Sequence, residues 1–462
     1  MALKSFRGGA HPPEMKGLSA GKPIQYYQAK GEMVFPLSQH IGKPAVPAVK
    51  KNDPVLAGQI IARADGYISA NIISSCSGKV KTIESRMTSA GVIAQCIVID
   101  NDGAYTLAEG IGTTCDYTRL TPPQIIEKVR AAGVVGLGGA GFPTHVKLAP
   151  KNPEEIDYII ANGAECEPYI TCDDQLMRTK PEWVVGGLKV LLHMFGHARA
   201  VIAIEDNKPE AIAAMGKAIA GEDRMEVMVL KTKVPQGGER NLVHAVTGRK
   251  MASTDLPANL GCIVDNVMTL AAIYRAVCLN EPLMEKGFTV TGDAVAEPGN
   301  FLVKIGTSFA ELLEAAGGFK AQPKKVLIGG PMMGIAATDL NVPIAKSYNA
   351  LVCLTEDPVE KAEAQMTNCI RCGRCARACP VGLVPQMLSL YAQRKDYEHY
   401  VKLNGLDCLA CGTCAFVCPA KRPLTQLFKM TKAVILNQRA VQAAKEREKE
   451  QQKQKEKEAA KA

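Results

Sequence analysis

The sequence predicts a multidomain protein of the α/β and α+β classes, on three observations. Short apolar runs separated by tight turns fill residues 34–100, strands and helices alternate over 121–279, and two cysteine runs of identical spacing lie near the C-terminus. A chain of 462 residues has room for several domains, at roughly 100–200 residues each. The predicted domains are residues 1–117, 118–278, 279–350 and 351–432, followed by a charged tail over 433–462.

The first domain is predicted to contain a small all-β module. Lys51–Pro54, Ala64–Gly66 and Cys76–Lys79 are typical of tight turns between short strands. The run KNDPVLAGQIIA…SSCSGKVKTI resembles the barrel of biotinyl and lipoyl carriers. Such carriers present an acceptor lysine in a motif such as Met-Lys-Met or Asp-Lys, and neither occurs in this region. We therefore expect a lipoyl-like barrel without the cofactor.

The second domain is predicted to alternate strands and helices, which is typical of an α/β fold. Its strands are expected over Tyr158–Ala161, Ala200–Ile204 and Met225–Leu230, and its helices from Thr121 and over Pro181–Phe195, Pro209–Ile219 and Val267–Leu279. Residues 286–320 predict two strands, a Pro-Gly turn and one helix. A further helix, Val384–Arg394, is expected beside the first cysteine run.

The two cysteine runs carry the strongest chemical signal. Each reads C-x2-C-x2-C-x3-C-P, the spacing with which bacterial ferredoxins bind iron–sulfur clusters. We predict two [4Fe–4S] clusters and one-electron transfer. In two-cluster ferredoxins the fourth cysteine of each run ligates the other cluster. The predicted ligand sets are Cys369, Cys372 and Cys375 with Cys418, and Cys408, Cys411 and Cys414 with Cys379.

Two other uses of these cysteines are weaker. Zinc accepts paired CxxC ligands, but it needs only four and does not favour this triple spacing. Disulfides require an oxidising compartment, and nothing in the sequence points to export. The remaining eight cysteines are scattered, and most are expected to be small buried side chains.

Composition excludes other classes of function. The net charge is +9, but no basic stripe with interleaved aromatic residues favours nucleic-acid binding. The N-terminus has no apolar core typical of a signal peptide. No run approaches the ~20 apolar residues of a transmembrane helix, so a membrane role is expected to depend on partners. The tail over 445–462 is expected to be a solvated helix or disordered, with a docking arm as the alternative.

A glycine-rich loop, GLGGAGFPT over residues 136–144, is the second chemical feature. It matches G-x-G-x-x-G, but a dinucleotide fingerprint needs a strand before the loop, and here a helix is predicted. Clustered glycines let the backbone approach a flat ring or a phosphate; a purely structural loop is the alternative. The acidic segment 162–168 follows a strand end, where α/β proteins place ligands, although it could also be a solvated acidic loop.

Together these segments resemble the family of C subunits of bacterial Rnf complexes, which are ion-translocating ferredoxin:NAD oxidoreductases. The central part is also similar to the NADH- and FMN-binding subunit of complex I, which has one cysteine run, and to the A subunit of the sodium-pumping quinone reductase, which has none. The motifs that carry the resemblance, besides the cysteine runs, are GLGGAGFPT with Lys147, NGAECEPYITCDDQLM (162–177), VPQGGER (234–240), DNVMT (265–269) and GGPMMG (329–334).

The resemblance implies a Rossmann-like domain whose glycine loop cradles FMN and the nicotinamide end of NADH. It also implies that residues 286–320 belong to a β-grasp domain of the SLBB type. The cofactors carry the chemistry, so no side chain is expected to act as a catalytic acid or base. The residues implied to contact FMN or NAD(H) are Gly136, Gly138, Gly139, Gly141, Phe142, Lys147, Asn162, Glu165, Glu167, Asn266 and Thr269.

The expected function is that of a peripheral subunit on the cytoplasmic face of the cell membrane. It would pass electrons between NAD(H) and ferredoxin through FMN and two [4Fe–4S] clusters. The implied partners are the membrane and peripheral subunits of an Rnf-type complex, including a ferredoxin-like iron–sulfur subunit. Two alternatives remain open: an electron-relay subunit without flavin, and a soluble diaphorase subunit of a hydrogenase or formate dehydrogenase.

Overall fold

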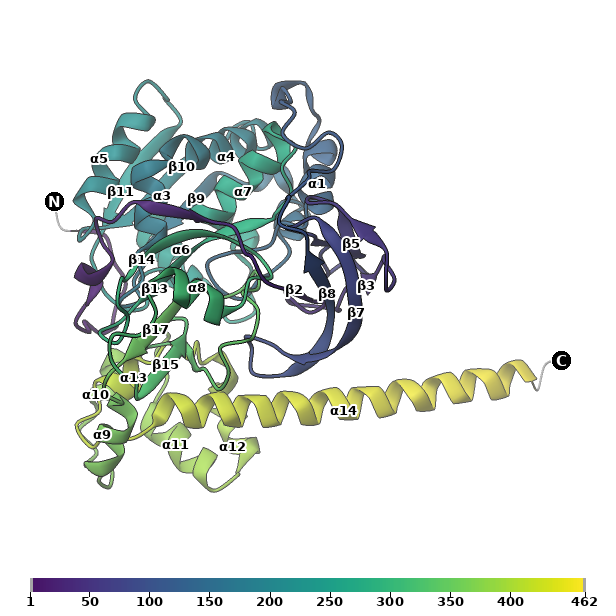
Figure 1. Cartoon of the computed structure of the whole chain (residues 1–462). Coiled ribbons are helices and arrows are strands. Elements are labelled where there is room, and N and C mark those ends of the chain that lie inside the picture. Colours follow the sequence, from purple (N-terminus) through teal and green to yellow (C-terminus); the bar gives the residue numbers. More distant parts are fainter. Residues whose placement is uncertain (1–2, 460–462) are drawn as a thin grey trace. The chain divides into compact units, whose positions relative to one another are not determined.

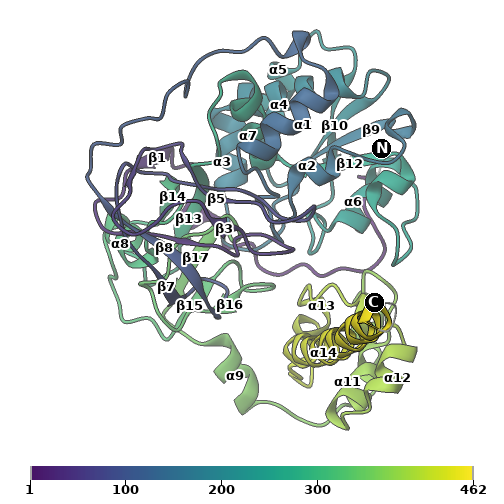
Figure 2. The ribbon, with the colours of Figure 1, turned by 90° about the vertical axis from the view of Figure 1, so that its right-hand side faces the viewer.

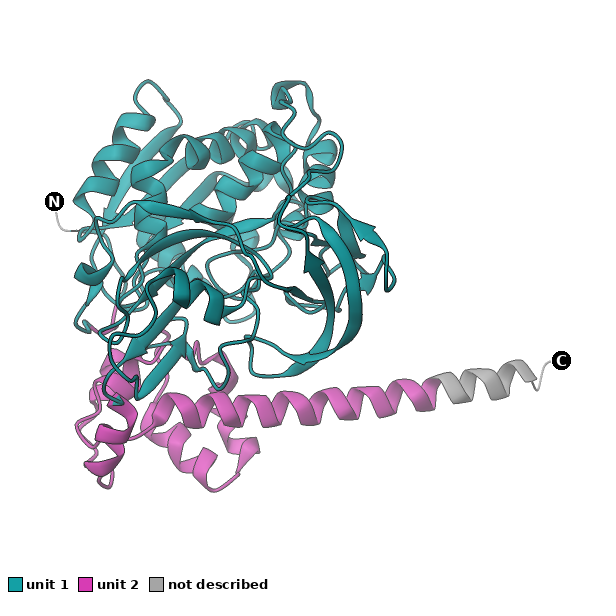
Figure 3. Ribbon diagram, in the orientation of Figure 1, with its two compact units in different colours: residues 1–6, 11–357 teal, residues 7–10, 358–462 magenta. Residues whose placement is uncertain are grey.

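The computed structural model describes residues 3–459, with side chains described up to residue 450. The described chain forms two compact units, coloured separately in Figure 3. The first comprises residues 3–6 and 11–357, and the second comprises residues 7–10 and 358–459. None of the helices over this range combines the length and apolar character needed to cross a bilayer.

The N-terminal part of the first unit is the predicted small β-structure. Buried side chains such as Phe35, Ile61 and Ile97 fill the core between its two sheets. The turn at Gly78 admits only glycine, because a Cβ there would lie 2.0 Å from the Asp100 carbonyl oxygen. One antiparallel sheet has the order β2 (Met33–Pro36), β8 (Ile93–Asn101), β7 (Gly78–Met87) and β4 (Pro54–Val55), and the other has β3 (Val46–Pro47), β5 (Ile60–Arg63) and β6 (Ile72–Ile73).

The predicted α/β domain is built on a parallel four-stranded sheet. The strand order is β11 (Met225–Leu230), β10 (Arg199–Glu205), β9 (Tyr158–Gly163) and β12 (Cys262–Asn266). Alternate strand residues point to opposite faces. One face packs on a core that includes α4 (Pro181–Met194) and α7 (Val267–Cys278), whereas the other packs on α6 (Glu239–Thr247), as Figure 2 shows.

Helices α4 and α7 cross closely because small residues lie at the contact. A Cβ on Gly187 would be 2.2 Å from the Leu270 carbonyl oxygen, so only glycine fits there. Because β9 and β12 are parallel neighbours, their carboxyl ends lie at the same edge of the sheet. The acidic segment begins at the end of β9, and Asn266 is the last residue of β12. The remaining helices of the domain are α1 (Pro122–Ala131), α2 (Thr144–Lys147), α3 (Cys172–Thr179) and α5 (Pro209–Ala218).

A six-stranded mixed sheet completes the first unit. Phe288 and Phe301 on its strands pack against Phe309 and Leu312 of α8 (Phe309–Ala315). The strand order is β1 (Ile24–Tyr27), β14 (Gly299–Lys304), β13 (Glu285–Thr291), β17 (Ala350–Leu354), β15 (Lys325–Ile328) and β16 (Ile335–Ala336). Strand β1 comes from the N-terminal segment and pairs in parallel with β14, which the sequence did not predict.

The second unit is helical. Leu388, Tyr400, Leu424 and Phe428 form its core. The start of α14 (Leu424–Ala459) packs on this core, and the helix continues without a break to Ala459 (Figure 1). Of the two states expected for the charged tail, the structure therefore has the helix up to Ala459; residues 460–462 lie outside the described part. The other helices are α9 (Pro358–Ala364), α10 (Arg374–Ala378), α11 (Pro385–Gln393), α12 (Tyr397–Lys402) and α13 (Thr413–Phe416).

Candidate functional site

The glycine loop is closed at its base by two hydrogen bonds. The Gly136 N–H donates to the Phe142 carbonyl at 2.9 Å, which folds the intervening residues into a narrow loop. The Leu137 N–H donates to the Thr269 hydroxyl on α7, also at 2.9 Å. Residues 138–140 are exposed above this base. Thr269, expected from the resemblance to contact FMN, thus supports the loop from beneath.

Two neighbouring domains hold the ends of the loop. Before the loop, the Gly133 carbonyl accepts a bond of 2.6 Å from the buried Nζ of Lys346. After it, the Gly141 carbonyl accepts the N–H of Ile41 at 3.1 Å. The Lys346 N–H in turn donates to Gln39 Oε1 at 3.2 Å. The loop is therefore fixed by the N-terminal β-structure on one side and by the chain leading into β17 on the other.

The Thr269 bond can be tested by a shape-preserving change. Thr269→Val removes the acceptor and leaves the Leu137 N–H, on a residue that is 2% exposed, without a partner. Because an unsatisfied buried donor costs roughly 1–3 kcal/mol, we expect the free energy of unfolding to fall by that amount. We also expect faster hydrogen exchange at the Leu137 amide. Thr269→Ser keeps the hydroxyl and serves as the control; equal stability of both variants would contradict the assignment.

Gly138 lies directly against Asn266, where β12 ends. A Cβ at Gly138 would be 2.8 Å from Cγ and Nδ2 of Asn266. Asn266 itself is fixed, because its Oδ1 accepts the Met268 N–H at 2.9 Å as the N-cap of α7, and its Nδ2 donates to Asp173 Oδ2 at 2.6 Å. The bare backbone at Gly138 is thus a surface that a side chain would obstruct, beside the N-terminus of a helix.

Glu165 caps helix α3. Its side chain is 6% exposed, and its two oxygens accept the N–H groups of Asp173 at 2.8 Å and Asp174 at 3.4 Å. Backbone donors and the helix dipole at this end both favour a negative charge. Glu165 is therefore linked to Asn266 through Asp173. The backbone N–H of Asp173 donates to Glu165, and the carboxylate of Asp173 accepts the side-chain amide of Asn266.

Asn162 and Glu167 are engaged in bonds that shape the surrounding loops. Asn162 Nδ2 donates to the Gly237 carbonyl at 2.9 Å, which ties the VPQGGER segment to the end of β9. Glu167 Oε2 accepts the Met332 N–H at 3.1 Å. A Cβ on Gly330 would lie 2.2 Å from that oxygen, so the GGPMMG segment needs its glycine to approach the acidic segment.

Lys147 joins two acidic residues beside the loop. Its Nζ lies 3.2 Å from Glu239 Oε1 and 3.8 Å from Asp265 Oδ1, and it donates to the Val264 carbonyl at 2.8 Å. Burial opposes its charge, but Asp265 and Glu239 outweigh burial and raise the pKa of Lys147. Burial also raises the pKa of Asp265 to about 6, and its oxygens accept no hydrogen bond from the described residues. A buried carboxylate of this kind leaves room for a ligand hydroxyl or a water.

Four residues of the site were not singled out from the sequence, although each lies inside a motif quoted for the resemblance. Asp173 bonds Asn266 and its neighbour Asp174 does not, but nothing in the local sequence distinguishes them, because Asp173 and Asn266 lie far apart along the chain. These four are Asp173, Gly237, Glu239 and Asp265; Lys346 and Ile41, which hold the ends of the loop, lie outside those motifs and were also missed.

In the second unit, one pocket is lined by the last cysteine of the first run and the first three of the second: Cys379, Cys408, Cys411 and Cys414. Burial raises the pKa of Cys375, and the nearby thiol of Cys418 adds to that rise. Each run therefore brings its fourth cysteine toward the other run. All sixteen cysteines lie within the described residues and are free. Four sulfur donors around one pocket match the number that a [4Fe–4S] cluster takes.

Family models cover most of the chain. The Nuo51 FMN-binding domain matches residues 129–275, and the 4Fe-4S dicluster domain matches residues 368–421. The RnfC barrel sandwich hybrid domain matches residues 4–104, and the SLBB domain matches residues 288–336. The fold class predicted from the sequence is thus confirmed, with a barrel, an FMN-binding domain, an SLBB domain and a two-cluster domain in that order.

Curated relatives match nearly the whole chain. The C subunit of the proton-translocating ferredoxin:NAD(+) oxidoreductase complex of Clostridium ljungdahlii is 45% identical over 93% of this chain and 94% of that protein. The C subunit of the Na(+)-translocating complex of Acetobacterium woodii is 41% identical over 94% of this chain and 98% of that protein. Among solved structures, a chain of an NAD+-reducing [NiFe]-hydrogenase in the H2-reduced state is 22% identical, with a TM-score of 0.48 over 69% of this chain and 63% of that one.

Proposed function

We propose that this chain, which belongs to the family of C subunits of ion-translocating ferredoxin:NAD+ oxidoreductase (Rnf) complexes, is the peripheral subunit that exchanges electrons with NAD(H). It binds FMN in the α/β domain and two [4Fe–4S] clusters in the second unit. The observation that carries this proposal is the bare, exposed backbone at Gly138, held against Asn266 at the N-terminus of α7, in a chain that also lines one pocket with Cys379, Cys408, Cys411 and Cys414.

The loop residues would hold FMN by close approach of backbone rather than by side chains. Residues 138–140 offer exposed backbone to the flat isoalloxazine ring. The N-terminus of α7, with Asn266 as its cap, favours an anionic group such as the FMN phosphate. Lys147 adds a positive charge, and the buried Asp265 carboxylate offers an acceptor for a ribityl hydroxyl. FMN, once bound, supplies the conversion between hydride transfer and single-electron transfer.

The protein's own part in this reaction is positioning. Hydrogen bonds to Thr269, Lys346 and Ile41 hold the loop at both ends before any ligand binds. Phe142, which is half-buried, would pack against the nicotinamide or flavin. The clusters held by the cysteines would then accept the electrons one at a time. Cys369, Cys372, Cys375 and Cys418 would hold one cluster, and Cys379, Cys408, Cys411 and Cys414 the other.

The partners follow from the family. The chain is expected to associate with the membrane and peripheral subunits of an Rnf-type complex, including a ferredoxin-like iron–sulfur subunit, on the cytoplasmic face of the membrane. Ion translocation then belongs to those partners. A soluble diaphorase would instead associate with a soluble hydrogenase or formate dehydrogenase, so the subunits recovered with this chain from solubilised membranes distinguish the two.

The proposed cofactor content can be tested on the purified chain. We expect acid to release about one FMN per chain, identified by its absorbance near 450 nm, and the native protein to reduce ferricyanide with NADH. The control is the same protein after FMN has been removed by dialysis against salt, which should lose the activity and regain it when FMN is added. Protein that contains clusters but has neither releasable flavin nor NADH–ferricyanide activity would support a relay subunit instead.

A further inference from the structure

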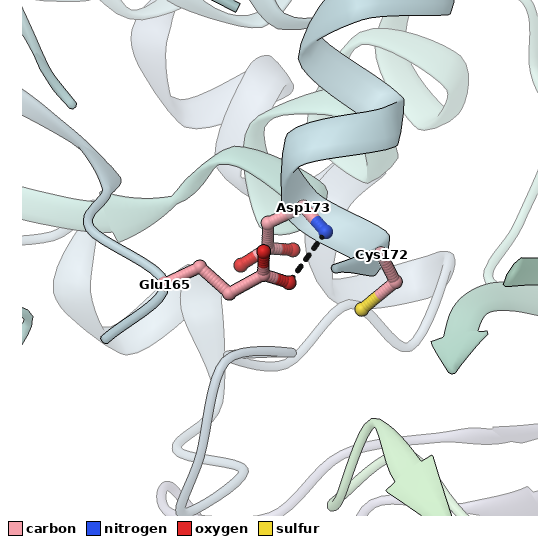
Figure 4. A group of neighbouring side chains, drawn as sticks. All are labelled: Glu165, Cys172 and Asp173. Atoms are coloured by element: carbon pink, nitrogen blue, oxygen red, sulfur yellow. Dashed lines mark hydrogen bonds between the residues drawn. The ribbon is translucent and has the colours of Figure 1, made fainter. Parts of the chain in front are cut away.

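Two buried carboxyl groups face each other beside the candidate flavin site. Figure 4 shows Glu165 and Asp173 with their carboxyl groups side by side and the sulfur of Cys172 close by. The ligand atoms of these three residues all lie within 4.8 Å of one another. Glu165 is 6% exposed and Asp173 is 5% exposed. Two ionised carboxylates this close and this deeply buried repel each other, so the pair needs a counter-charge.

The nearby lysines do not bond the pair. Lys16 donates to backbone carbonyls, including that of Glu165, and Lys286 also donates to backbone carbonyls. Lys208 bonds the carboxylate of Glu205. The remaining charged groups near the pair are Asp174 and Arg178 of the same helix, which form an ion pair with each other at 3.5 Å. The lysines lower the electrostatic cost of the pair without neutralising either carboxylate directly.

A metal ion is a poor occupant for this cluster. Lys16, Lys208 and Lys286 lie near it, and their positive charges would repel a divalent cation. Burial lowers the pKa of Lys16 and lowers that of Lys286 to about 8, so Lys286 also carries its proton at neutral pH. Burial raises the pKa of the Cys172 thiol well above its usual value, so the sulfur stays protonated and is not a thiolate ligand. Three carboxylate oxygens of the pair already accept hydrogen bonds from N–H groups. The counter-charge that fits is a proton.

We propose that the Glu165–Asp173 pair holds one proton, and that binding of this proton is linked to the charge of the flavin bound at Gly138. The second half rests on the proposed function. We assign the proton to Asp173, because both oxygens of Glu165 already accept backbone N–H groups, whereas Asp173 accepts the Asn266 amide at Oδ2. In agreement, burial and then the charge of Glu165 raise the pKa of Asp173 to about 7. A group with that pKa is half protonated near neutral pH.

The link to the flavin passes through one residue. Asn266 donates to Asp173 at 2.6 Å and lies against Gly138, where a Cβ would be 2.8 Å from its amide. With FMN bound beside Gly138, hydride transfer from NADH would bring two electrons and one proton to this surface, which is one net negative charge. That charge would raise the proton affinity of Asp173, so the fraction of pairs that hold the proton would rise, with the proton taken from solvent. Loss of that charge would return the proton to solvent.

The proton itself can be tested in flavin-free protein, as stability against pH. An acid whose pKa is raised on folding stabilises the folded state at low pH, and this contribution is lost as pH rises from about 4, the unfolded value, through about 7. We therefore expect Asp173→Asn to gain Tm relative to the unmodified protein as pH rises from 5 to 8. Parallel Tm profiles would overturn the proposal. A Tm profile of the unmodified protein that changes when EDTA is added would also overturn the proposal, because it would indicate that the pair binds a metal cation.

The linkage can be tested through the midpoint potential of the bound FMN, measured between pH 6 and 8. One proton taken up per two electrons shifts the potential by about 29.6 mV for each tenfold change in proton concentration. Asp173→Asn should reduce the slope of potential against pH by up to that amount. Asp174→Asn is the matched control and should keep the slope, because Asp174 pairs with Arg178 and does not bond Asn266. An unchanged slope in Asp173→Asn would overturn the linkage.

The two experiments separate this inference from the proposed function. Protein that binds no FMN would overturn the proposed function and the flavin linkage together. The stability profiles need no flavin, so in that case they would still support or overturn the protonated pair. Protein that binds FMN but shows no effect of Asp173→Asn in either experiment would overturn the inference and leave the proposed function standing.

Discussion

Gly138→Val is expected to abolish FMN retention while leaving the absorbance of the clusters near normal. A Cβ at this position already lies 2.8 Å from Asn266, and valine adds two methyl groups that must displace either Asn266 or the flavin. Overpacking of this kind typically costs about 1–3 kcal/mol, so FMN affinity should fall by about 5-fold to 150-fold. Flavin content per chain after gel filtration measures the effect.

Gly216→Val is the control for this substitution. Gly216 is exposed on α5 of the same domain, and a Cβ there meets nothing within 4 Å. This variant should therefore keep its flavin, because the added side chain meets no neighbour and valine is a better helix former than glycine. Retention of FMN by Gly138→Val at the level of the control would contradict the assignment of the glycine loop.

Cys411→Ala is expected to remove one cluster and leave NADH–FMN chemistry intact. Cys411 is 8% exposed and lines the pocket shared with Cys379, Cys408 and Cys414. A [4Fe–4S] cluster with only three thiolates at a buried position is lost during purification, so iron and acid-labile sulfide should fall by about half. NADH–ferricyanide activity should persist, because the flavin lies in the other unit.

Crossed ligation makes a sharper version of this experiment possible. If Cys379 belongs to the second cluster, Cys379→Ala should remove the same cluster as Cys411→Ala, and the two variants should give the same residual EPR spectrum after reduction. Cys418→Ala should instead remove the first cluster. Matching spectra for Cys379→Ala and Cys375→Ala would contradict the crossed sets.

The sequence predicted the elements of this fold well because their patterns are local. Pro181–Phe195 was predicted as a helix, and α4 covers Pro181–Met194; Met225–Leu230 was predicted as a strand and is one. Strand β1 was missed because it pairs with β14, far along the chain. A pairing of that kind leaves no signal in the short segment that makes it.

The site was predictable only as a set of motifs. The glycine loop and Asn266 were found from the sequence, and the structure brings Gly138 and Asn266 together. The roles of single residues depend on contacts between distant segments. Thr269 supports the loop, and the buried Lys346 reaches Gly133 from another domain. A lysine is rarely buried without an acidic partner, so no sequence pattern would have assigned it there.

The central claim is that this chain exchanges electron pairs with NAD(H) through FMN and single electrons through its clusters. The most direct test reduces the purified protein with dithionite, removes the excess, and mixes it anaerobically with NAD+. We expect absorbance at 340 nm to rise as NADH forms while the clusters are reoxidised, and we expect FMN-depleted protein to do neither. Reduced clusters that NAD+ does not reoxidise in FMN-replete protein, or that it reoxidises equally well without FMN, would contradict the account.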